Sequence, residues 1–134
     1  MRYNSTMSQK TILIVEDSVD LADTLHDMLV MHGYTTLVAT TGREAIDLAL
    51  SHHPDLIMLD IRLPDISGYE VHHAIRQDNW GKTARFSVLT ASESLENISK
   101  NINLPVKDIL FKPNCSVAHI IEHIEGRLSD QSTE

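Results

Sequence analysis

The sequence predicts an α/β fold, with a parallel sheet of five strands and helices on both of its faces. Five times along the chain, a short run typical of a strand is followed by a segment with apolar residues at helical spacing. Three of the runs are continuously apolar, as expected of strands that are covered on both faces. The 134 residues are enough for one domain with a single core and too few for two ordinary domains.

The first strand is predicted at residues 11–15, because TILIV is apolar and rich in β-branched side chains. Two adjacent acids, Glu16 and Asp17, follow it directly. A helix comes next, since apolar residues recur there at helical spacing, namely Leu21, Leu25, Met28 and Leu29. Gly33 suits the left-handed turn that ends a helix. Residues 34–39 then predict a shorter second strand.

The second helix opens at residues 41–44, and Pro54 closes it. Its apolar side consists of Ala45, Ile46, Leu48, Ala49 and Leu50. Residues 56–59, with the sequence LIML, form an apolar run that predicts a fully buried third strand. This strand ends in a single carboxylate, Asp60. Turn-forming residues follow it closely, namely Pro64, Asp65 and Gly68.

The third helix is predicted at residues 68–77, with Val71, Ala74 and Ile75 facing inward. Residues 85–89 predict the fourth strand, which ends in Thr90. The fourth helix is rich in Ser and Asn, which have poor helix propensity. Its apolar residues are Leu95, Ile98 and Ile102.

The fifth strand is predicted at residues 106–111, and Lys112 and Pro113 end it. Asn114 or Ser116 can cap the last helix. The inner face of this helix consists of Val117, Ile120, Ile121, Ile124 and Leu128.

Together these elements predict a flavodoxin-like, doubly wound (βα)5 domain with the strand order 2-1-3-4-5, one of the two common orders for this class. The domain is expected to span residues 9–128. Residues 1–8 are polar and without pattern, and they predict a disordered lead-in. Residues 129–134 predict a frayed tail.

The charge balance argues against direct DNA binding. Nineteen acidic residues outnumber eleven Lys and Arg, and no basic run is present. Cys115 is the single cysteine, so an internal disulfide is excluded, and a cytoplasmic location fits. No apolar stretch approaches the length of a membrane span, and the N-terminus lacks the apolar core of a signal peptide. We therefore expect no membrane partner.

Five polar residues follow the predicted strands, at what would be one edge of the sheet: Glu16, Asp17, Asp60, Thr90 and Lys112. Three close carboxylates repel one another unless a cation intervenes, and Mg²⁺ suits oxygen ligands of this kind. A carboxylate can also accept a phosphoryl group, whose oxygens an ammonium and a hydroxyl can bind. Read alone, Asp60 is equally well explained as a helix cap.

In these residues the chain resembles the receiver domain of two-component response regulators. The resemblance covers roughly residues 10–128 and includes Pro64 and Gly68 after the third strand. It implies that Asp60 is the phosphoacceptor and that Glu16, Asp17 and Asp60 hold Mg²⁺, for which Mn²⁺ could substitute. It further implies that Thr90 is the switch hydroxyl and that Lys112 binds the phosphoryl group.

The resemblance implies three finer features. The backbone carbonyl of Arg62 completes the metal site. The side chains of Arg62 and Ser92 lie next to the phosphoryl group and tune its lifetime. The peptide bond before Pro113 is cis, the isomer that X-Pro bonds allow at low cost.

Two departures from the family pattern concern the output of the domain. Receivers often carry Tyr or Phe three residues before the lysine, where this chain has Ile109. The segment before the fifth strand usually contains Gly-Ala-Asp, whereas residues 103–108 read NLPVKD. We therefore expect the phosphorylation chemistry to be intact and aromatic-coupled switching to be altered.

The predicted function is that of a single-domain response regulator. It accepts a phosphoryl group on Asp60 from a phosphohistidine of a sensor kinase or phosphotransfer protein, and it switches a surface for an unknown downstream protein. It is not an enzyme, although it takes part in its own phosphorylation and dephosphorylation. Homodimerisation is possible. The alternatives are a phosphorelay intermediate, a fragment of a longer regulator and a receiver-like module that binds partners without phosphorylation.

Two other classes fit the residues less well. A phosphohydrolase of the haloacid dehalogenase type needs a second Asp two residues after its nucleophile, where this chain has Arg62. A flavodoxin-type module needs a phosphate loop after the first strand, where Glu16 and Asp17 would repel the phosphate. His119 and His123 have the i, i+4 spacing of metal ligands, but a solvated helix face explains them better because no third ligand is evident. A redox role for Cys115 is a further alternative.

Overall fold

The computed structural model describes residues 9–91 and 94–129. The predicted lead-in at residues 1–8 lies outside the described residues, as does residue 130 onward in the predicted tail. Ser129, which was predicted to begin the tail, instead belongs to the last helix.

A five-stranded sheet forms the centre of the molecule. Its strands are parallel and lie in the order β2-β1-β3-β4-β5, so the predicted fold class and strand order are confirmed. The strands are β1 (Thr11–Val15), β2 (Thr35–Ala39), β3 (Leu56–Leu59), β4 (Phe86–Thr90) and β5 (Ile109–Phe111).

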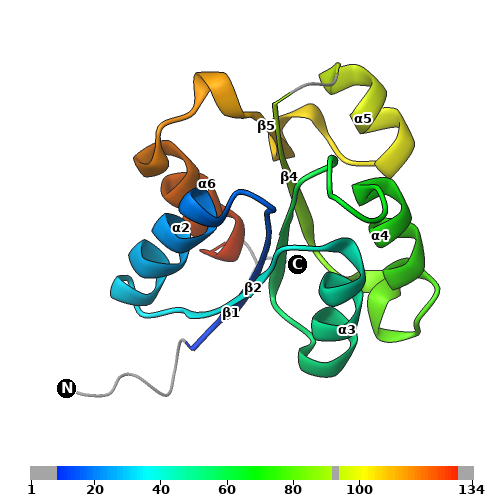
Figure 1. The fold of residues 1–134 in the computed structure, drawn as a ribbon, viewed down its shortest axis with the longest axis horizontal. Helices are drawn as coiled ribbons and strands as arrows, with labels where there is room; N and C mark the ends of the chain where they lie inside the picture. Colours follow the sequence, from blue (N-terminus) through cyan, green and yellow to red (C-terminus); the bar gives the residue numbers. More distant parts are fainter. Residues whose placement is uncertain (1–8, 92–93, 130–134) are drawn as a thin grey trace.

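Helices cover both faces of the sheet. Figure 1 shows α2 and α6 on one side and α3, α4 and α5 on the other. Their bounds are α2 (Val19–Met31), α3 (Gly42–His52), α4 (Gly68–Arg76), α5 (Leu95–Ile102) and α6 (Val117–Ser129). Of the two residues predicted to cap the last helix, Ser116 does so: its hydroxyl accepts a hydrogen bond from the His119 N–H at 3.1 Å.

The core has two halves because successive side chains of a strand point to opposite faces. In β1, Leu13 and Val15 pack on the side of α3, α4 and α5, whereas Ile12 and Ile14 pack on the side of α2 and α6. β3 is buried along its whole length. This burial on both faces explains why the LIML run shows no alternation of polar and apolar residues.

The predicted fifth strand is too long at its start. Val106–Asp108 form a short 3-10 helix, η2, and only Ile109–Phe111 join the sheet. The carboxylate of Asp108 is buried and pairs with Arg127 of α6 at 3.1 Å. The ion pair ties this segment to α6, a contact that strand propensity does not report.

The expected solvated helix face describes only one of the two histidines of the last helix. His119 is exposed, but His123 is partly buried, and its Nε2 lies 2.9 Å from the Ser87 hydroxyl in β4. Burial lowers the pKa of His123. Ser87 is itself fully buried, so His123 satisfies a polar group in the core.

Within the described ranges 9–91 and 94–129, no helix is both long enough and apolar enough to cross a bilayer.

His72 of α4 should make the stability of the fold depend on pH. Its ring packs edge-on against Phe86 of β4, with the centroids 4.7 Å apart. Its buried Nε2 has no hydrogen-bond partner among the described residues. Burial, together with the charges of Arg76 and His73, lowers the pKa of His72 from its usual 6.5 to about 4. The folded state therefore favours the neutral imidazole, and its stabilising effect is lost as the pH falls from 6.5 through 4.

We expect the free energy of unfolding to fall by about 2 kcal/mol between pH 7 and pH 4 because of His72 alone. In His72→Leu this part of the pH dependence should vanish, whereas His73→Leu, at an exposed neighbouring position, should keep it. Urea unfolding of the three proteins at both pH values measures the difference. Burial raises the pKa of Glu16, so this residue changes the free energy of unfolding with pH in the opposite direction to His72. The contribution of Glu16 is the same in all three proteins and cancels when they are compared. Equal pH dependence in wild type and His72→Leu would contradict the expectation.

Candidate functional site

Adjacent strand ends place Glu16 beside Asp60. β1 pairs with β3 so that Val15 lies opposite Leu59, and the next residue of each strand is an acid. The Asp60 N–H donates to the Val15 carbonyl at 3.1 Å, which continues the ladder to the edge of the sheet. Both acids are buried, with 1% of Glu16 and 4% of Asp60 exposed. Water therefore solvates their charges poorly, and the charges depend on groups of the protein or a bound ion.

A third carboxylate completes an acidic cluster. One oxygen each of Glu16, Asp17 and Asp60 lie within 4.8 Å of one another. Asp17 is exposed, so the cluster opens to solvent on its side. Oxygen ligands at this spacing suit a hard divalent cation.

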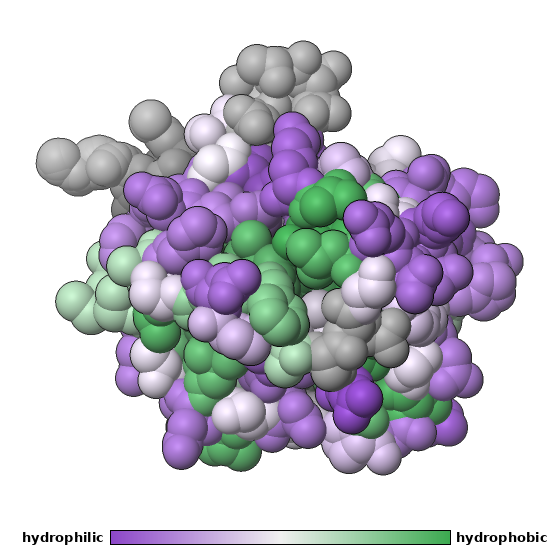
Figure 2. Space-filling view, turned by 90° about the horizontal axis from the view of Figure 1, so that it is seen from above, coloured by the Kyte–Doolittle hydropathy of each residue, from purple (hydrophilic) through white to green (hydrophobic). Residues whose placement is uncertain are grey.

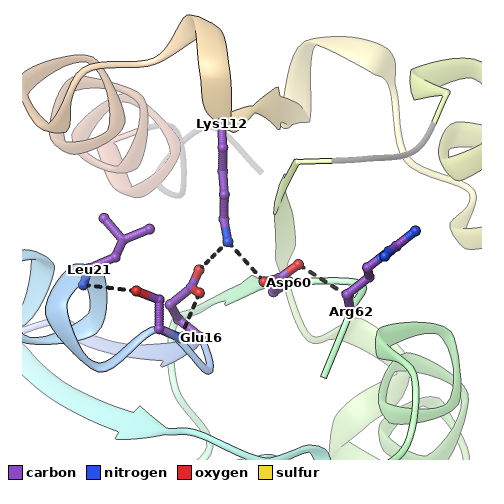
Figure 3. Close-up of polar contacts among 6 residues, drawn as sticks. Glu16, Leu21, Asp60, Arg62 and Lys112 are labelled. Carbon is purple, nitrogen blue, oxygen red and sulfur yellow. Dashed lines mark hydrogen bonds and ion pairs between the residues drawn. The ribbon is translucent and has the colours of Figure 1, made fainter. Parts of the chain in front are cut away.

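Lys112 reaches the two buried acids from the end of β5 (Figure 3). Its Nζ lies 2.8 Å from Glu16 Oε1 and 3.0 Å from Asp60 Oδ2. Burial by itself would lower the pKa of the Lys112 ammonium, but its hydrogen bonds to Glu16 and Asp60 raise the pKa overall. Burial raises the pKa of Glu16, and the hydrogen bonds from Lys112 and the Ser18 N–H offset part of that effect.

The Asp60 carboxylate is held at both of its oxygens. Oδ2 accepts from Lys112, and Oδ1 accepts from the Arg62 backbone N–H at 3.2 Å. These bonds fix the plane of the carboxylate with respect to the loop that follows β3. The sequence did not predict the N–H contributions of Ser18 and Arg62, because backbone donors carry no side-chain signature.

Gly68 is required by the close approach of α4 to the end of β3. A Cβ at this position would collide with the Asp60 carbonyl oxygen and would lie 2.8 Å from Ile61 Cα. The Gly68 N–H donates to the Ile61 carbonyl at 2.7 Å. The turn residue that the sequence predicted therefore closes the loop directly behind Asp60.

Thr90 ends β4 at the same edge. The residue is fully buried, and its hydroxyl has no hydrogen-bond partner within the part of the chain that the structure describes. An unpaired buried hydroxyl costs free energy, on the order of 1–3 kcal/mol. A buried hydroxyl without a partner can donate to an acceptor atom that comes within reach.

The predicted cis peptide before Pro113 is wrong. The described residues contain no cis peptide bond. Lys112–Asn114 instead form a short 3-10 helix, η3, in which the Cys115 N–H donates to the Lys112 carbonyl at 3.0 Å. The trans isomer is the more stable one for X-Pro bonds, by about 0.5–1 kcal/mol, and Lys112 reaches both acids with it.

The remaining predicted positions differ in their placement. The side chain of Arg62 is exposed. Ser92 lies outside the described residues. Ile109 is buried, at 4% exposure, in the half of the core beneath α5, so it acts there as a packing residue.

Comparisons with known proteins agree with this geometry. Residues 12–125 match the response regulator receiver domain family. The polar-differentiation response regulator DivK of Brucella ovis is 33% identical over 121 residues, which are 90% of this chain and 98% of DivK.

Solved structures show the same fold. The signal receiver domain of the putative LuxO repressor protein from Vibrio parahaemolyticus has a TM-score of 0.81 at 28% identity, over 93% of this chain and 94% of the other. The non-phosphorylated HemR receiver domain from Leptospira biflexa has a TM-score of 0.80 at 29% identity, over 90% and 95% of the two chains. The family match covers nearly all of the described chain, and it agrees with the sheet order and with the acids at the ends of β1 and β3. The protein therefore belongs to the response regulator receiver domain family.

Proposed function

We propose that this receiver domain is a phosphorylation switch in which Asp60 accepts a phosphoryl group from a phosphohistidine of a sensor kinase or phosphotransfer protein. The observation that carries the proposal is the setting of Asp60. This buried carboxylate is held by Lys112 and by the Arg62 N–H, and the unpaired hydroxyl of Thr90 ends a strand at the same edge.

The donor set fits Mg²⁺, and Mn²⁺ could replace it. The side chains of Asp17, Asp60 and Glu16 would hold the ion, together with the backbone carbonyl of Arg62. When bound, the cation neutralises negative charge between the carboxylates and the phosphoryl oxygens. Burial raises the pKa of Glu16, and a cation bound beside this carboxylate would oppose that effect by stabilising its charged form.

In the proposed step, a carboxylate oxygen of Asp60 attacks the phosphorus of the phosphohistidine. An O–P bond forms, the P–N bond breaks, and its electron pair stays on the imidazole nitrogen of the donor. Lys112 and Thr90 donate hydrogen bonds to the phosphoryl oxygens, which carry the charge in the transition state. The domain is changed by the reaction, so it is a phosphoacceptor that takes part in its own phosphorylation and dephosphorylation, and not an enzyme.

The phosphoryl group adds charge and three strong hydrogen-bond acceptors, which can draw Thr90 and Lys112 toward Asp60 and bias a two-state surface. Figure 2, which looks onto the molecule from above, shows apolar patches among hydrophilic residues on this face. Because position 109 carries a buried aliphatic side chain, Ile109, we propose that the output does not depend on an inward swing of an aromatic ring there. A cytoplasmic location belongs to the same proposal, since histidine kinases present their phosphohistidine there.

The chemical class of the product distinguishes phosphorylation of a carboxylate from phosphorylation of a Ser or Thr hydroxyl. We expect the protein, incubated with phosphoramidate and Mg²⁺, to gain one phosphoryl group that neutral hydroxylamine removes, because hydroxylamine cleaves acyl phosphates. Phosphate esters of Ser or Thr resist this treatment. Intact mass before and after hydroxylamine gives the result. A stable adduct, or no adduct with either phosphoramidate or acetyl phosphate, would contradict the proposal.

A further inference from the structure

The loop after Asp60 is bonded to the start of α3 through Asp65. Residues 61–67 are called the acceptor loop here. Asp65 Oδ1 accepts from the Gly42 N–H at 2.7 Å, and Oδ2 accepts from the Arg43 N–H at 3.0 Å. The first N–H groups of a helix have no partner within the helix, and the helix dipole favours a negative charge there. One carboxylate from another part of the chain therefore satisfies two of them.

Asp65 adds to the local cap of α3 and does not replace it. The hydroxyl of Thr41 already caps the helix by accepting from the Glu44 N–H at 3.2 Å. The hydrogen bonds from Arg43 and Gly42 lower the pKa of Asp65 to about 2. The carboxylate is thus ionised, and both of its bonds are charge-assisted, throughout the neutral range. A residue that served only to form the turn would need neither of these hydrogen bonds to α3.

A packing contact supports the same junction. A Cβ at position 42 would lie 2.5 Å from Ile66 Cγ1 and 2.9 Å from Val71 Cγ2. A side chain at position 42 would displace Ile66 or Val71, so glycine allows the acceptor loop to pack this closely against the start of α3. Ile66, next to Asp65, packs against the α3 side of the core. Both polar and apolar contacts therefore hold the middle of the acceptor loop against the start of α3.

The other fixed points of the acceptor loop lie at the functional site. The Arg62 N–H donates to Asp60 Oδ1, and the Ile61 carbonyl accepts from Gly68. The side chains of Arg62 and Pro64 are exposed and contribute little to holding the loop. The Arg62 backbone is then flanked by its bond to Asp60 on one side, and on the other by Leu63, which packs against the core, and by Asp65.

We propose that Asp65 is a positioning residue for the phosphoryl-acceptor site, which clamps the acceptor loop to α3 and so holds the Arg62 backbone in place. The inference rests on the proposed function, in which the Arg62 N–H orients Asp60 and the Arg62 carbonyl helps to bind Mg²⁺. The ion pair between Arg43 Nε and Asp65 Oδ2, at 3.9 Å on an exposed side chain, adds little to the clamp.

The test compares Asp65→Ala with Asp65→Asn and with Asp47→Ala, which removes an exposed carboxylate from the same helix α3. We expect the Mg²⁺ dissociation constant, measured by calorimetry, to rise about tenfold in Asp65→Ala. Asp65→Asn keeps one acceptor oxygen and should lie between Asp65→Ala and wild type. Asp47→Ala should match wild type. The NMR signal of the Arg62 amide should move in the same order as the Mg²⁺ affinity.

A purely structural cap would give a different pattern. It would lower the melting temperature of Asp65→Ala and leave the Mg²⁺ affinity and the Arg62 amide signal as in wild type, and that result would overturn the proposal. Should Asp65→Ala not fold, Asp65→Asn carries the same two readouts. Failure of the wild-type protein to accept a phosphoryl group would contradict the proposed function instead, while the Arg62 amide signal would still decide whether Asp65 holds the loop.

Discussion

Replacing Lys112 with methionine should slow phosphorylation of the protein by about a hundredfold or more and also destabilise the fold. The loss of rate is expected because Lys112 is the ammonium group that lies against Asp60, and removal of one donor to a developing negative charge costs about 10²–10³ in rate. The loss of stability follows from the two buried acids, which would face each other without their cation. Methionine keeps most of the length of the side chain, so the change isolates the charge.

Removal of one partner from a buried ion pair costs about 3–5 kcal/mol. The side chain of Lys112 keeps 22% of its exposure and Asp17 opens the cluster to solvent, so we expect a smaller loss of about 2 kcal/mol in the free energy of unfolding. Mg²⁺ should restore more stability to this variant than to wild type, since binding to the folded state stabilises it.

Urea unfolding with and without Mg²⁺, together with the rate of phosphorylation by acetyl phosphate, measures both effects. Lys107→Met, which removes an exposed lysine from η2, should behave as wild type. A Lys112→Met protein that is phosphorylated at the wild-type rate would show that the ammonium does not bind the phosphoryl group.

Asp60→Asn should abolish phosphorylation and leave the fold intact. Asparagine has the shape of aspartate, and its carbonyl oxygen can still accept from the Arg62 N–H or from Lys112. It cannot form the acyl phosphate. The change also removes one of three crowded carboxylates, so Mg²⁺ should bind more weakly. Asp47→Asn, at an exposed position of α3, should keep full phosphorylation. If Asp60→Asn were still phosphorylated, another residue would be the phosphoacceptor.

The sequence predicts the fold well because its signals are local. Each strand is a compact apolar run, and each of the first three helices begins or ends near a glycine or proline that the chain shows plainly. Once the strands are parallel, their carboxyl ends meet at one edge, so Glu16, Asp60 and Lys112 could be expected to converge. The structure confirms that convergence at 2.8 and 3.0 Å.

The features that the sequence did not predict depend on contacts between distant segments. The sequence shows Asp65 as a turn residue, yet its oxygens cap a helix that starts 23 residues earlier. His123 shows the spacing of an exposed helix face, yet it satisfies the buried hydroxyl of Ser87. The start of the predicted fifth strand forms η2, where Asp108 is paired with Arg127. Only the packed arrangement of β4, β5 and α6 decides these last two cases.

The peptide bond before Pro113 is a different kind of miss. The expectation of a cis bond came from family resemblance, and the sequence contains no local signal that decides between the isomers. The trans bond in this chain still brings Lys112 to both acids.

Intact mass after incubation with acetyl phosphate and Mg²⁺, measured for wild type and Asp60→Asn side by side, decides whether Asp60 is the phosphoacceptor. We predict a single phosphoryl adduct on wild type, which is absent when a chelator removes the metal and absent from Asp60→Asn. Wild-type protein that gains no adduct, or Asp60→Asn that gains the same one, would contradict the assignment of Asp60 as the phosphoacceptor.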